Sequence, residues 1–266
     1  WRAIYRQQVD SFQEATSLPD DLRQRLKAEF NIGNLTPITE LRSGDGSTIK
    51  TLFGLPDGKQ IETVLMKYHK RHTVCISTQA GCALNCQFCA TGQMGFERNL
   101  TVGEIVAQVL WASRLLRSEK IGLTNIVLMG MGEPFHNYDN SLSALDRLGD
   151  AAGLAIGARR ITLSTAGLTP AIQRFARAGR REGLAISLHA ATDELRSQLM
   201  PINRHHPLAQ LMDACHEYVG ITGRRLSFEW ALIQGINDSS NQAEALCKLL
   251  SGMLCHVNLI PLNPTP

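Results

Sequence analysis

Six short apolar runs, separated by longer helical patterns, constrain the fold more than any other feature of this 266-residue sequence. Each run is typical of a buried strand, and together they occupy residues 73–77, 125–129, 160–164, 184–189, 226–232 and 256–260. The clearest helix between them begins with a capping box of Thr101 and Glu104 and carries one apolar stripe. Strands that alternate with helices predict an α/β fold built on a parallel sheet. A partial barrel of six units and an open doubly wound sheet both satisfy this pattern.

The N-terminal part of the sequence follows a different pattern. Residues 1–33 are predicted to be helical, because Leu22, Leu26 and Phe30 recur at a spacing of four and Gly33 can end the pattern. Residues 38–67 indicate a small sheet, in which two β-rich runs flank the turn signal "PDG". The sequence therefore predicts a helical and β-hairpin appendage in front of the βα array.

Unusual loops follow the predicted strands at their carboxyl ends, where reactive residues gather in both candidate architectures. A cysteine-rich loop follows the first strand, and the loop "GMGEP" follows the second. The third strand ends in "STAG", the fourth in "SLHA" and the sixth in "PLNP". We therefore expect the functional site at this edge of the sheet.

The loop "GCALNCQFCATG" places Cys82, Cys86 and Cys89 within eight residues. Its flanking glycines permit tight turns, so the three thiolates can converge on one centre. A structural zinc site needs a fourth ligand, for which the distant candidates are His69, His72, Cys75 and His189. Three free buried cysteines are a further alternative. A 4Fe-4S cluster with one iron left open to a non-protein ligand is the interpretation that we favour.

Composition limits the class of protein. Seven cysteines in a chain of this length, three of them clustered, indicate a metal site in a reducing cytoplasm rather than a disulfide scaffold. The sequence contains no run of 18 apolar residues and no signal-peptide pattern, so we expect no membrane span. It starts at Trp1 and stops at Pro266 without a recognisable end, and we expect a fragment of a longer reading frame.

The motifs together resemble one family. The spacing Cys-x3-Cys-x2-Cys after a first strand, with Phe88 before the last cysteine, is similar to the radical S-adenosylmethionine (SAM) superfamily. The segments "QMGFERNLT", "MGMGEP", "ITLSTAG", "AISLHAATDELRSQLMPINR" and "VNLIPLNP" follow the order of the RlmN/Cfr family of RNA adenine methyltransferases. The resemblance implies a partial (β/α)6 TIM-like radical SAM barrel at residues 71–266, without its C-terminal segment. It also implies a partial accessory helical domain at 1–35 and a β-hairpin extension at 36–70.

The resemblance also implies the site residues. The cluster ligands are Cys82, Cys86 and Cys89. Contacts to S-adenosyl-L-methionine fall on the amino-group site Gly132 and Glu133, on Ser164, Ser187, Leu188 and His189 for the ribose and carboxylate, and on Asn263 for the adenosine. Glu62 matches a proton acceptor, and Cys75 matches a thiol that resolves a covalent protein–RNA intermediate.

Each of these residues also has an ordinary structural explanation. Glu62 on an amphipathic strand is most often a solvated surface residue, and Cys75 is a small hydrophobic core residue. The loop "GMGEP" alone indicates only a glycine-rich turn. The strand-end polar residues alone would satisfy nearby backbone groups. Three further cysteines have no motif partner, and we predict that they lie in the core: Cys215, Cys247 and Cys255.

The function implied by the resemblance is methylation of adenine C2 in 23S ribosomal RNA, with transfer RNA as a second substrate. The reaction uses the 4Fe-4S cluster, a 5′-deoxyadenosyl radical and a methylated cysteine from a segment past Pro266. Cys255 precedes the "NLIP" motif and cannot match that cysteine by position. We therefore expect these 266 residues to bind a cluster and cleave SAM, but not to methylate RNA.

Two alternatives remain open at this point. One is Cfr-like methylation at adenine C8 of 23S rRNA, which confers antibiotic resistance. The other is a non-catalytic RNA-binding module or zinc-stabilised module. The implied partners are 23S rRNA, tRNA and an external electron donor of the flavodoxin or ferredoxin type, and the implied state is a cytoplasmic monomer.

Overall fold

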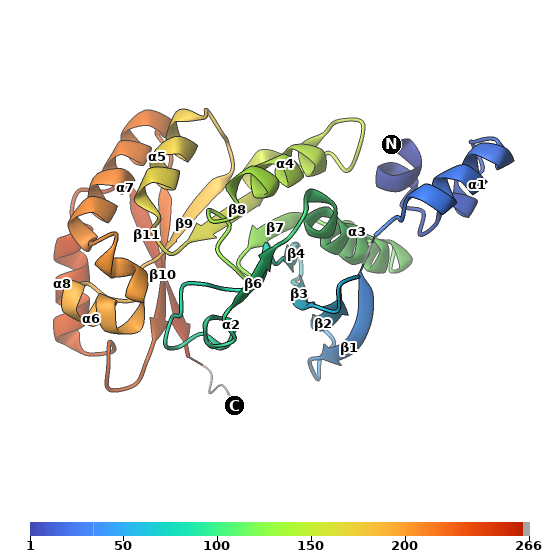
Figure 1. The fold of residues 1–266 in the computed structure, drawn as a ribbon. Coiled ribbons are helices and arrows are strands. Elements are labelled where there is room, and N and C mark those ends of the chain that lie inside the picture. The colour runs from blue at the N-terminus through green and yellow to red at the C-terminus, as the bar shows by residue number, and fades with distance from the viewer. Residues whose placement is uncertain (34, 263–266) are drawn as a thin grey trace. The chain divides into compact units, whose positions relative to one another are not determined.

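A computed structural model describes residues 1–33 and 35–262 of the protein (Figure 1). The chain divides into two compact units. The first consists of Trp1–Ala80, Arg98–Met131 and Asn137–Ile161. The second consists of Gly81–Glu97, Gly132–His136 and the chain from Thr162 onward.

The first unit is built on a mixed sheet with the strand order β1-β2-β3-β4-β7. Its strands are β1 (Thr36–Arg42), β2 (Thr48–Gly54), β3 (Gln60–Lys67), β4 (His72–Cys75) and β7 (Asn125–Leu128). The first four pair as antiparallel neighbours, and β7 pairs with β4 in parallel. The turn between β2 and β3 closes through a hydrogen bond from Leu55 N to Lys59 O of 2.8 Å, with Gly58 at φ +82°. The hairpin predicted around "PDG" is therefore confirmed.

The two faces of this sheet have different surroundings. Along β2 and β3, buried and half-buried residues alternate. The buried face packs against helix α3 (Val102–Ser118), as the edge-on contact of Phe53 with Trp111 at 5.2 Å shows. The Thr63 hydroxyl donates a hydrogen bond of 2.8 Å to Gln108 of the same helix. The predicted capping box of α3 is present, and helix α4 (Tyr138–Gly149) also belongs to this unit.

The N-terminal residues form short helical elements rather than one long helix. Helical turns at Ala3–Gln7 and Phe12–Glu14 precede helix α1 (Asp20–Glu29). No residue of α1 is buried, and Leu22 and Phe30 are exposed. The helical prediction is correct for α1, but its apolar stripe is not part of a hydrophobic core.

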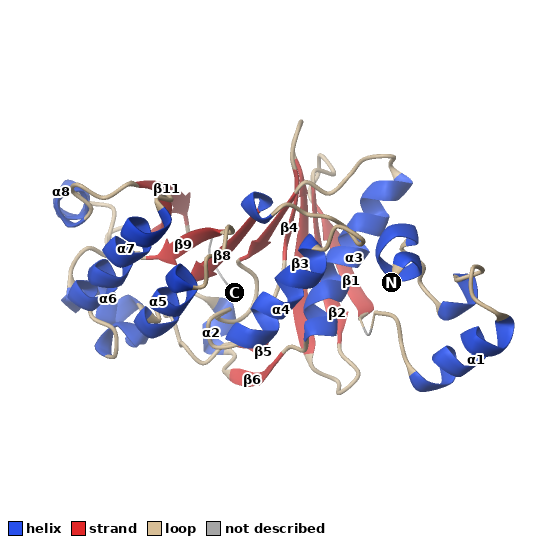
Figure 2. Cartoon of the chain, turned by 90° about the horizontal axis from the view of Figure 1, so that it is seen from above, coloured by secondary structure: helices blue, strands red, loops and turns tan. Residues whose placement is uncertain are grey.

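The second unit contains a parallel sheet with the order β8-β9-β10-β11 and helices along it (Figures 1 and 2). The strands are β8 (Ile161–Thr165), β9 (Gly183–Ser187), β10 (Leu226–Leu232) and β11 (Cys255–Pro261). The helices are α5 (Thr169–Arg177), α6 (Asp193–Leu199), α7 (Leu208–Thr222) and α8 (Ser240–Leu249), with a short helical turn at Pro201–Arg204. A similar turn at Ala158–Arg160 belongs to the first unit. The cysteine loop includes α2 (Ala90–Gln93) and is flanked by the short strands β5 (Gln79–Gly81) and β6 (Phe96–Asn99).

All six predicted barrel strands are present; β10 has the predicted bounds and the other five have shifted ends. The fourth stops at Ser187 instead of residue 189, because His189 adopts a left-handed conformation at φ +57°. The prediction of three core cysteines is correct only for Cys215, which is completely buried. Cys247 is exposed and Cys255 is partly exposed, because α8 buries only Leu246 and most residues of β11 are exposed. Within the described residues, no helix has both the length and the apolarity of a membrane span.

Candidate metal and cofactor site

The cysteine loop closes on itself through two glycines. Gly81 has φ +71°, and a Cβ atom there would lie 2.0 Å from the carbonyl oxygen of Gly95. The next residue fixes this approach, because Cys82 N donates to Gly95 O at 2.8 Å. At the other end, a Cβ atom on Gly92 would lie 2.9 Å from Cys86 N. A side chain at either position would force the loop open, so the backbone requires glycine at both Gly81 and Gly92.

The three thiols of the loop are near neighbours in a largely apolar setting. Cys82 is buried in a cluster with Leu84, Ala166 and Leu199, among others, and Cys86 packs against it. Burial raises the pKa of the Cys86 thiol to about 12, and electrostatic interaction with Cys89 and Cys82 acts in the same direction. Cys82 and Cys89 therefore both disfavour the ionised form of Cys86. A bound metal centre removes this conflict, because its positive charge stabilises thiolates.

The described residues contain no group of three histidine, cysteine or acidic side chains that could hold a metal ion. The loop therefore does not present a ready-made tetrahedral zinc site. A four-iron cluster is larger than one ion and holds its cysteine ligands further apart. Thiol chemistry, the glycine-dependent turns and the electrostatic proximity of the three sulfurs fit such a cluster.

Glu133 provides a buried carboxylate in the same unit. The residue is only 3% exposed, and its two carboxylate oxygens accept hydrogen bonds from Phe135 N at 3.0 Å and Ala166 N at 2.7 Å. Burial outweighs these bonds and raises the pKa of Glu133 to about 7. Gly132, just before it, has φ +94° and directs the turn. A carboxylate in this state is suited to an ammonium group, which would stabilise its ionised form.

Polar side chains also meet at the ends of β8 and β9. The hydroxyl oxygens of Ser164 and Ser187 lie 3.3 Å apart. His189 is buried, and its Nδ1 accepts a hydrogen bond of 2.9 Å from Ala231 N. This bond places the ring proton on Nε2, and burial lowers the pKa of His189 to about 3. The Phe88 ring from the cysteine loop contacts the imidazole edge-on at 4.6 Å, so the loop and the strand end lie side by side.

Leu188 and Asn263 were also predicted to contact the cofactor. Leu188 is completely buried, and its N–H donates to Glu229 O at 3.0 Å, so its surroundings do not favour direct contact with a ligand. Asn263 lies outside the described residues. Both assignments stay predictions.

Glu62 and Cys75 belong to the first unit and share one face of its sheet. Register places Cys75 opposite Val64, two residues from Glu62 on β3, so all three side chains point the same way. Glu62 pairs with Lys50 Nζ at 2.9 Å and its carboxylate is 41% exposed. The Cys75 residue retains some accessible surface, but burial of its sulfur raises the thiol pKa to about 12. This is the half-open face that α3 does not cover.

Sequence reasoning missed two residues that organise the second unit. Arg196 on α6 is completely buried and donates to carbonyls at the ends of β8 and β9. Asn237 is buried in the loop after β10, and its Nδ2 donates to His189 O at 2.8 Å and Ala231 O at 2.7 Å. The sequence could have indicated Asn237, because its loop follows the carboxyl end of the fifth predicted strand. That loop was the one strand-end loop to which we assigned no functional residue.

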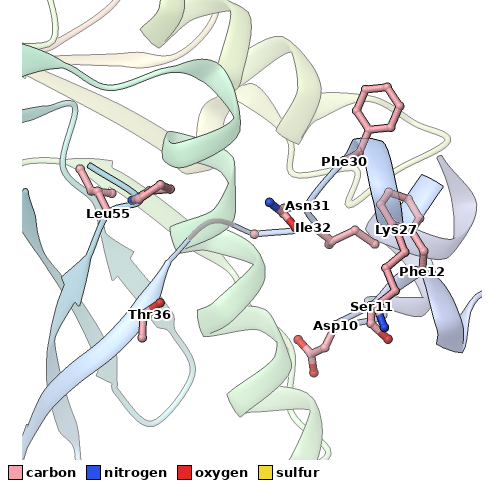
Figure 3. A pocket seen from close by; sticks show the side chains of 11 residues that line it. Asp10, Ser11, Phe12, Lys27, Phe30, Asn31, Ile32, Thr36 and Leu55 are labelled. Atoms are coloured by element: carbon pink, nitrogen blue, oxygen red, sulfur yellow. The ribbon is translucent and has the colours of Figure 1, made fainter. Parts of the chain in front are cut away.

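Two hollows lie outside this arrangement. One, of about 430 Å³, is lined in the first unit by Phe12, Lys27 and Phe30 on the helical side and by Thr36 and Leu55 on the strand side (Figure 3). The other, of about 500 Å³, lies at the carboxyl ends of β10 and β11 in the second unit. None of the described residues that we predicted to be catalytic, cofactor-binding or metal-binding lines either one.

Comparison with known proteins relates the whole chain to one group of enzymes. A sequence profile of the Radical SAM superfamily matches residues 76–245. The dual-specificity RNA methyltransferase RlmN 1 of Myxococcus xanthus is 53% identical over 265 residues, which cover all of this chain and 74% of that protein. A probable dual-specificity RNA methyltransferase RlmN of Chloroflexus aurantiacus is 50% identical, with 100% of this chain and 73% of that protein covered.

A solved structure agrees with these sequence matches. The crystal structure of a radical SAM methyltransferase from Sphaerobacter thermophilus has a TM-score of 0.98 and 54% identity, covering 100% of this chain and 78% of that one. This match confirms the predicted α/β fold of the radical SAM partial-barrel type. The superfamily uses a 4Fe-4S cluster and S-adenosylmethionine. The chain belongs to the radical SAM superfamily and, within it, to the RlmN family of RNA methyltransferases.

Proposed function

We propose that this protein methylates adenine C2 in 23S ribosomal RNA and in transfer RNA by radical SAM chemistry. The observation that carries the proposal is the match of the whole chain, at about half identity, to proteins named dual-specificity RNA methyltransferase RlmN. The second unit supports it, because its cysteine loop and buried carboxylate have the chemistry that the two cofactors require. When bound, the cluster and SAM together supply a carbon-centred radical.

In this proposal the residues of the second unit bind and orient the cofactors. Cys82, Cys86 and Cys89 hold the cluster, and the Glu133 carboxylate receives the SAM ammonium group. Ser164 and Ser187 offer two adjacent hydroxyls, whose mutual distance of 3.3 Å suits a hydrogen-bonded pair. Neutral His189 offers Nε2–H as a donor, since Nδ1 is already occupied by Ala231 N. Asn263 completes the proposed set through its amide.

In the first unit we assign the proton chemistry to Glu62 and Cys75. Glu62 is the proposed proton acceptor, and its exposed side chain, paired with Lys50, is accessible to do so. Cys75 is the proposed resolving thiol. Since its pKa is raised to about 12, it is protonated at neutral pH and needs a base before it can act as a nucleophile.

The remaining assignments concern partners and organisation. RNA substrates follow from the family, and a radical SAM enzyme requires a reductant. We propose a flavodoxin or ferredoxin as electron donor, a monomeric state and a cytoplasmic location. We also keep the division into an accessory domain at 1–35, a β-hairpin extension at 36–70 and the radical SAM core at 71–266 as a proposal.

Two measurements test the proposal. Anaerobically purified protein should be brown and contain about four irons per chain, and should cleave SAM when reduced. A colourless protein with one zinc per chain would reject it. Protein expressed from the complete gene should then convert adenosine in unmodified 23S rRNA and tRNA to the 2-methyl derivative, as mass analysis of nucleosides shows. Exclusive formation of 8-methyladenosine would instead assign the Cfr-type reaction.

A further inference from the structure

Arg196 is the most unusual charged residue of the second unit. It lies on α6, and none of its surface is exposed. Arginine is rarely buried completely unless it is paired. Burial lowers the pKa of its guanidinium to about 10, so the group still carries its charge at neutral pH. The structure thus keeps a full positive charge inside the unit.

The acceptors of this guanidinium are mostly neutral carbonyls. Nη2 donates to Ala166 O at 2.6 Å and to Ser187 O at 3.2 Å, and Nε donates to Leu188 O at 3.2 Å. Nη1 donates to Asn203 Oδ1 at 2.8 Å. Asp193 forms no direct hydrogen bond with the guanidinium among those described, but it interacts with it electrostatically, and its carboxylate accepts from Asn203 Nδ2 at 2.8 Å. The three carbonyls belong to the residues that end or follow β8 and β9, where the proposed cofactor contacts lie.

The backbone of Ala166 links the guanidinium to Glu133. The Ala166 carbonyl accepts from Arg196, while the Ala166 N–H donates to Glu133 Oε2 at 2.7 Å. The adjacent Gly167 has φ +110°, and a Cβ atom there would lie 3.3 Å from Arg196 Nη2. The backbone at Ala166 therefore passes between a buried cation and a buried carboxyl group, which hold the two consecutive peptide groups on either side of its Cα.

Stability alone does not explain this arrangement. A buried charge costs several kcal/mol in desolvation, and apolar residues of similar volume are often equally or more stabilising. Helix α6 brings this charge to the cysteine loop, because Leu199 of the helix packs with Cys82 and Cys86 in one apolar cluster. Leu199 O also accepts a hydrogen bond of 2.9 Å from Gln87 N of the loop. A positive charge in a low-dielectric interior acts strongly on any negative centre held by that loop.

We propose that Arg196 is a positioning residue that aligns the ends of β8 and β9 for SAM and supplies a fixed positive potential beside the cluster. The proposal rests on the function proposed above. It separates into two parts, since the forked geometry aligns the carbonyls and the charge stabilises the reduced, more negative cluster. Reduction of the cluster by the external electron donor is favoured when this charge is present.

Three variants of the anaerobically reconstituted holoprotein test both parts. Arg196→Met removes charge and geometry but keeps an apolar side chain of comparable length. Arg196→Lys keeps the charge and loses the fork. Arg177→Met is the control, because it removes the same charge from an exposed side chain of the same unit, which pairs with Glu217. Iron content, the cluster midpoint potential by EPR-monitored titration, the Kd for SAM and the Tm are measured for each.

The wild type must first contain the cluster and bind SAM, and its failure would refute the proposed function rather than this inference. We expect R196M to shift the midpoint potential to more negative values and to weaken SAM binding by about tenfold or more. R196K should weaken SAM binding similarly while its potential stays near that of the wild type. R177M should change neither.

A purely structural role gives a different result. R196M would then lower the Tm, while the potential and the Kd for SAM of the folded holoprotein match the wild type, and the proposal would be overturned. If R196M yields no folded protein, R196K decides, because wild-type SAM affinity in that variant is incompatible with alignment by the fork.

Discussion

Two carboxylates of this protein are held in opposite ways. Glu133 in the second unit is buried, and its oxygens accept hydrogen bonds from two backbone amides. Glu62 in the first unit is 41% exposed and pairs with the flexible side chain of Lys50. The backbone fixes the first carboxylate before any ligand arrives, whereas the second can change partner. This difference suits the roles we propose, since cofactor binding benefits from preorganisation and proton transfer from RNA to Glu62 requires access.

We expect the largest effect at Gly81, where the backbone of the cysteine loop leaves no room for a side chain. Gly81→Ala places a Cβ atom 2.0 Å from Gly95 O at a position with φ +71°. We expect a loss of stability on the order of 3 kcal/mol and loss of the cluster, because the cysteine loop cannot close. Urea denaturation and iron content after anaerobic reconstitution measure the two effects.

Gly157→Ala is the matched control, since Gly157 has φ −61° and a Cβ atom there would have no heavy atom within 4 Å. It should change stability by no more than about 0.5 kcal/mol and leave the iron content unchanged. Wild-type iron content in the Gly81 variant would show that the loop tolerates an open conformation.

The second prediction concerns the pH dependence of cluster-free protein. The folded-state pKa of Glu133 is about 7, against an ordinary value of 4.5. The folded state therefore binds this proton more tightly than the unfolded state. Its contribution to the free energy of unfolding is complete below pH 4.5 and is lost as the pH rises through 7. The predicted loss is about 3 kcal/mol.

Glu133→Gln cannot ionise and should remove this component. The difference in unfolding free energy between variant and wild type should therefore grow between pH 4.5 and pH 7 and then level off. A difference that stays constant between pH 4.5 and pH 7 would contradict this contribution of Glu133.

The third prediction concerns the hydrogen bond of His189. Leucine there would leave the buried Ala231 N–H without its acceptor, which costs about 1–3 kcal/mol. Asparagine carries Oδ1 near the position of Nδ1, so His189→Asn should recover most of that loss. Thermal denaturation compares the two variants. Equal stability of both would mean that ring packing against Phe88, and not the hydrogen bond, holds this residue.

Local patterns predicted the framework better than the site. Strand runs, the Thr101–Glu104 capping box and the "PDG" turn depend on neighbouring residues, and all three are present. The role of Arg196 depends on three carbonyls from two strands, and a charged residue is expected at the surface by default.

The error at Cys247 has the same origin. An apolar residue type indicates burial, but α8 buries only Leu246 and leaves Cys247 exposed. The cysteine spacing identified the metal loop from sequence, whereas the close approach of Gly81 to Gly95 required the fold. Local sequence thus predicts which elements form, and tertiary contacts decide which side chains they bury.

We expect the smallest effect at the exposed carboxylate, Glu62. Lys50→Met, Glu62→Gln and the double variant form a mutant cycle on one ion pair of 2.9 Å, whose side chains are 44% and 41% exposed. Exposed pairs couple by about 1 kcal/mol or less and weaken with salt, so we expect a small coupling that falls further in about 1 M NaCl. A coupling above about 2 kcal/mol would show that Glu62 is held as firmly as Glu133. E62Q should also lose RNA methylation without losing stability, as measured on protein expressed from the complete gene. This result would assign the Glu62 carboxylate to proton transfer, because its ion pair contributes little to folding.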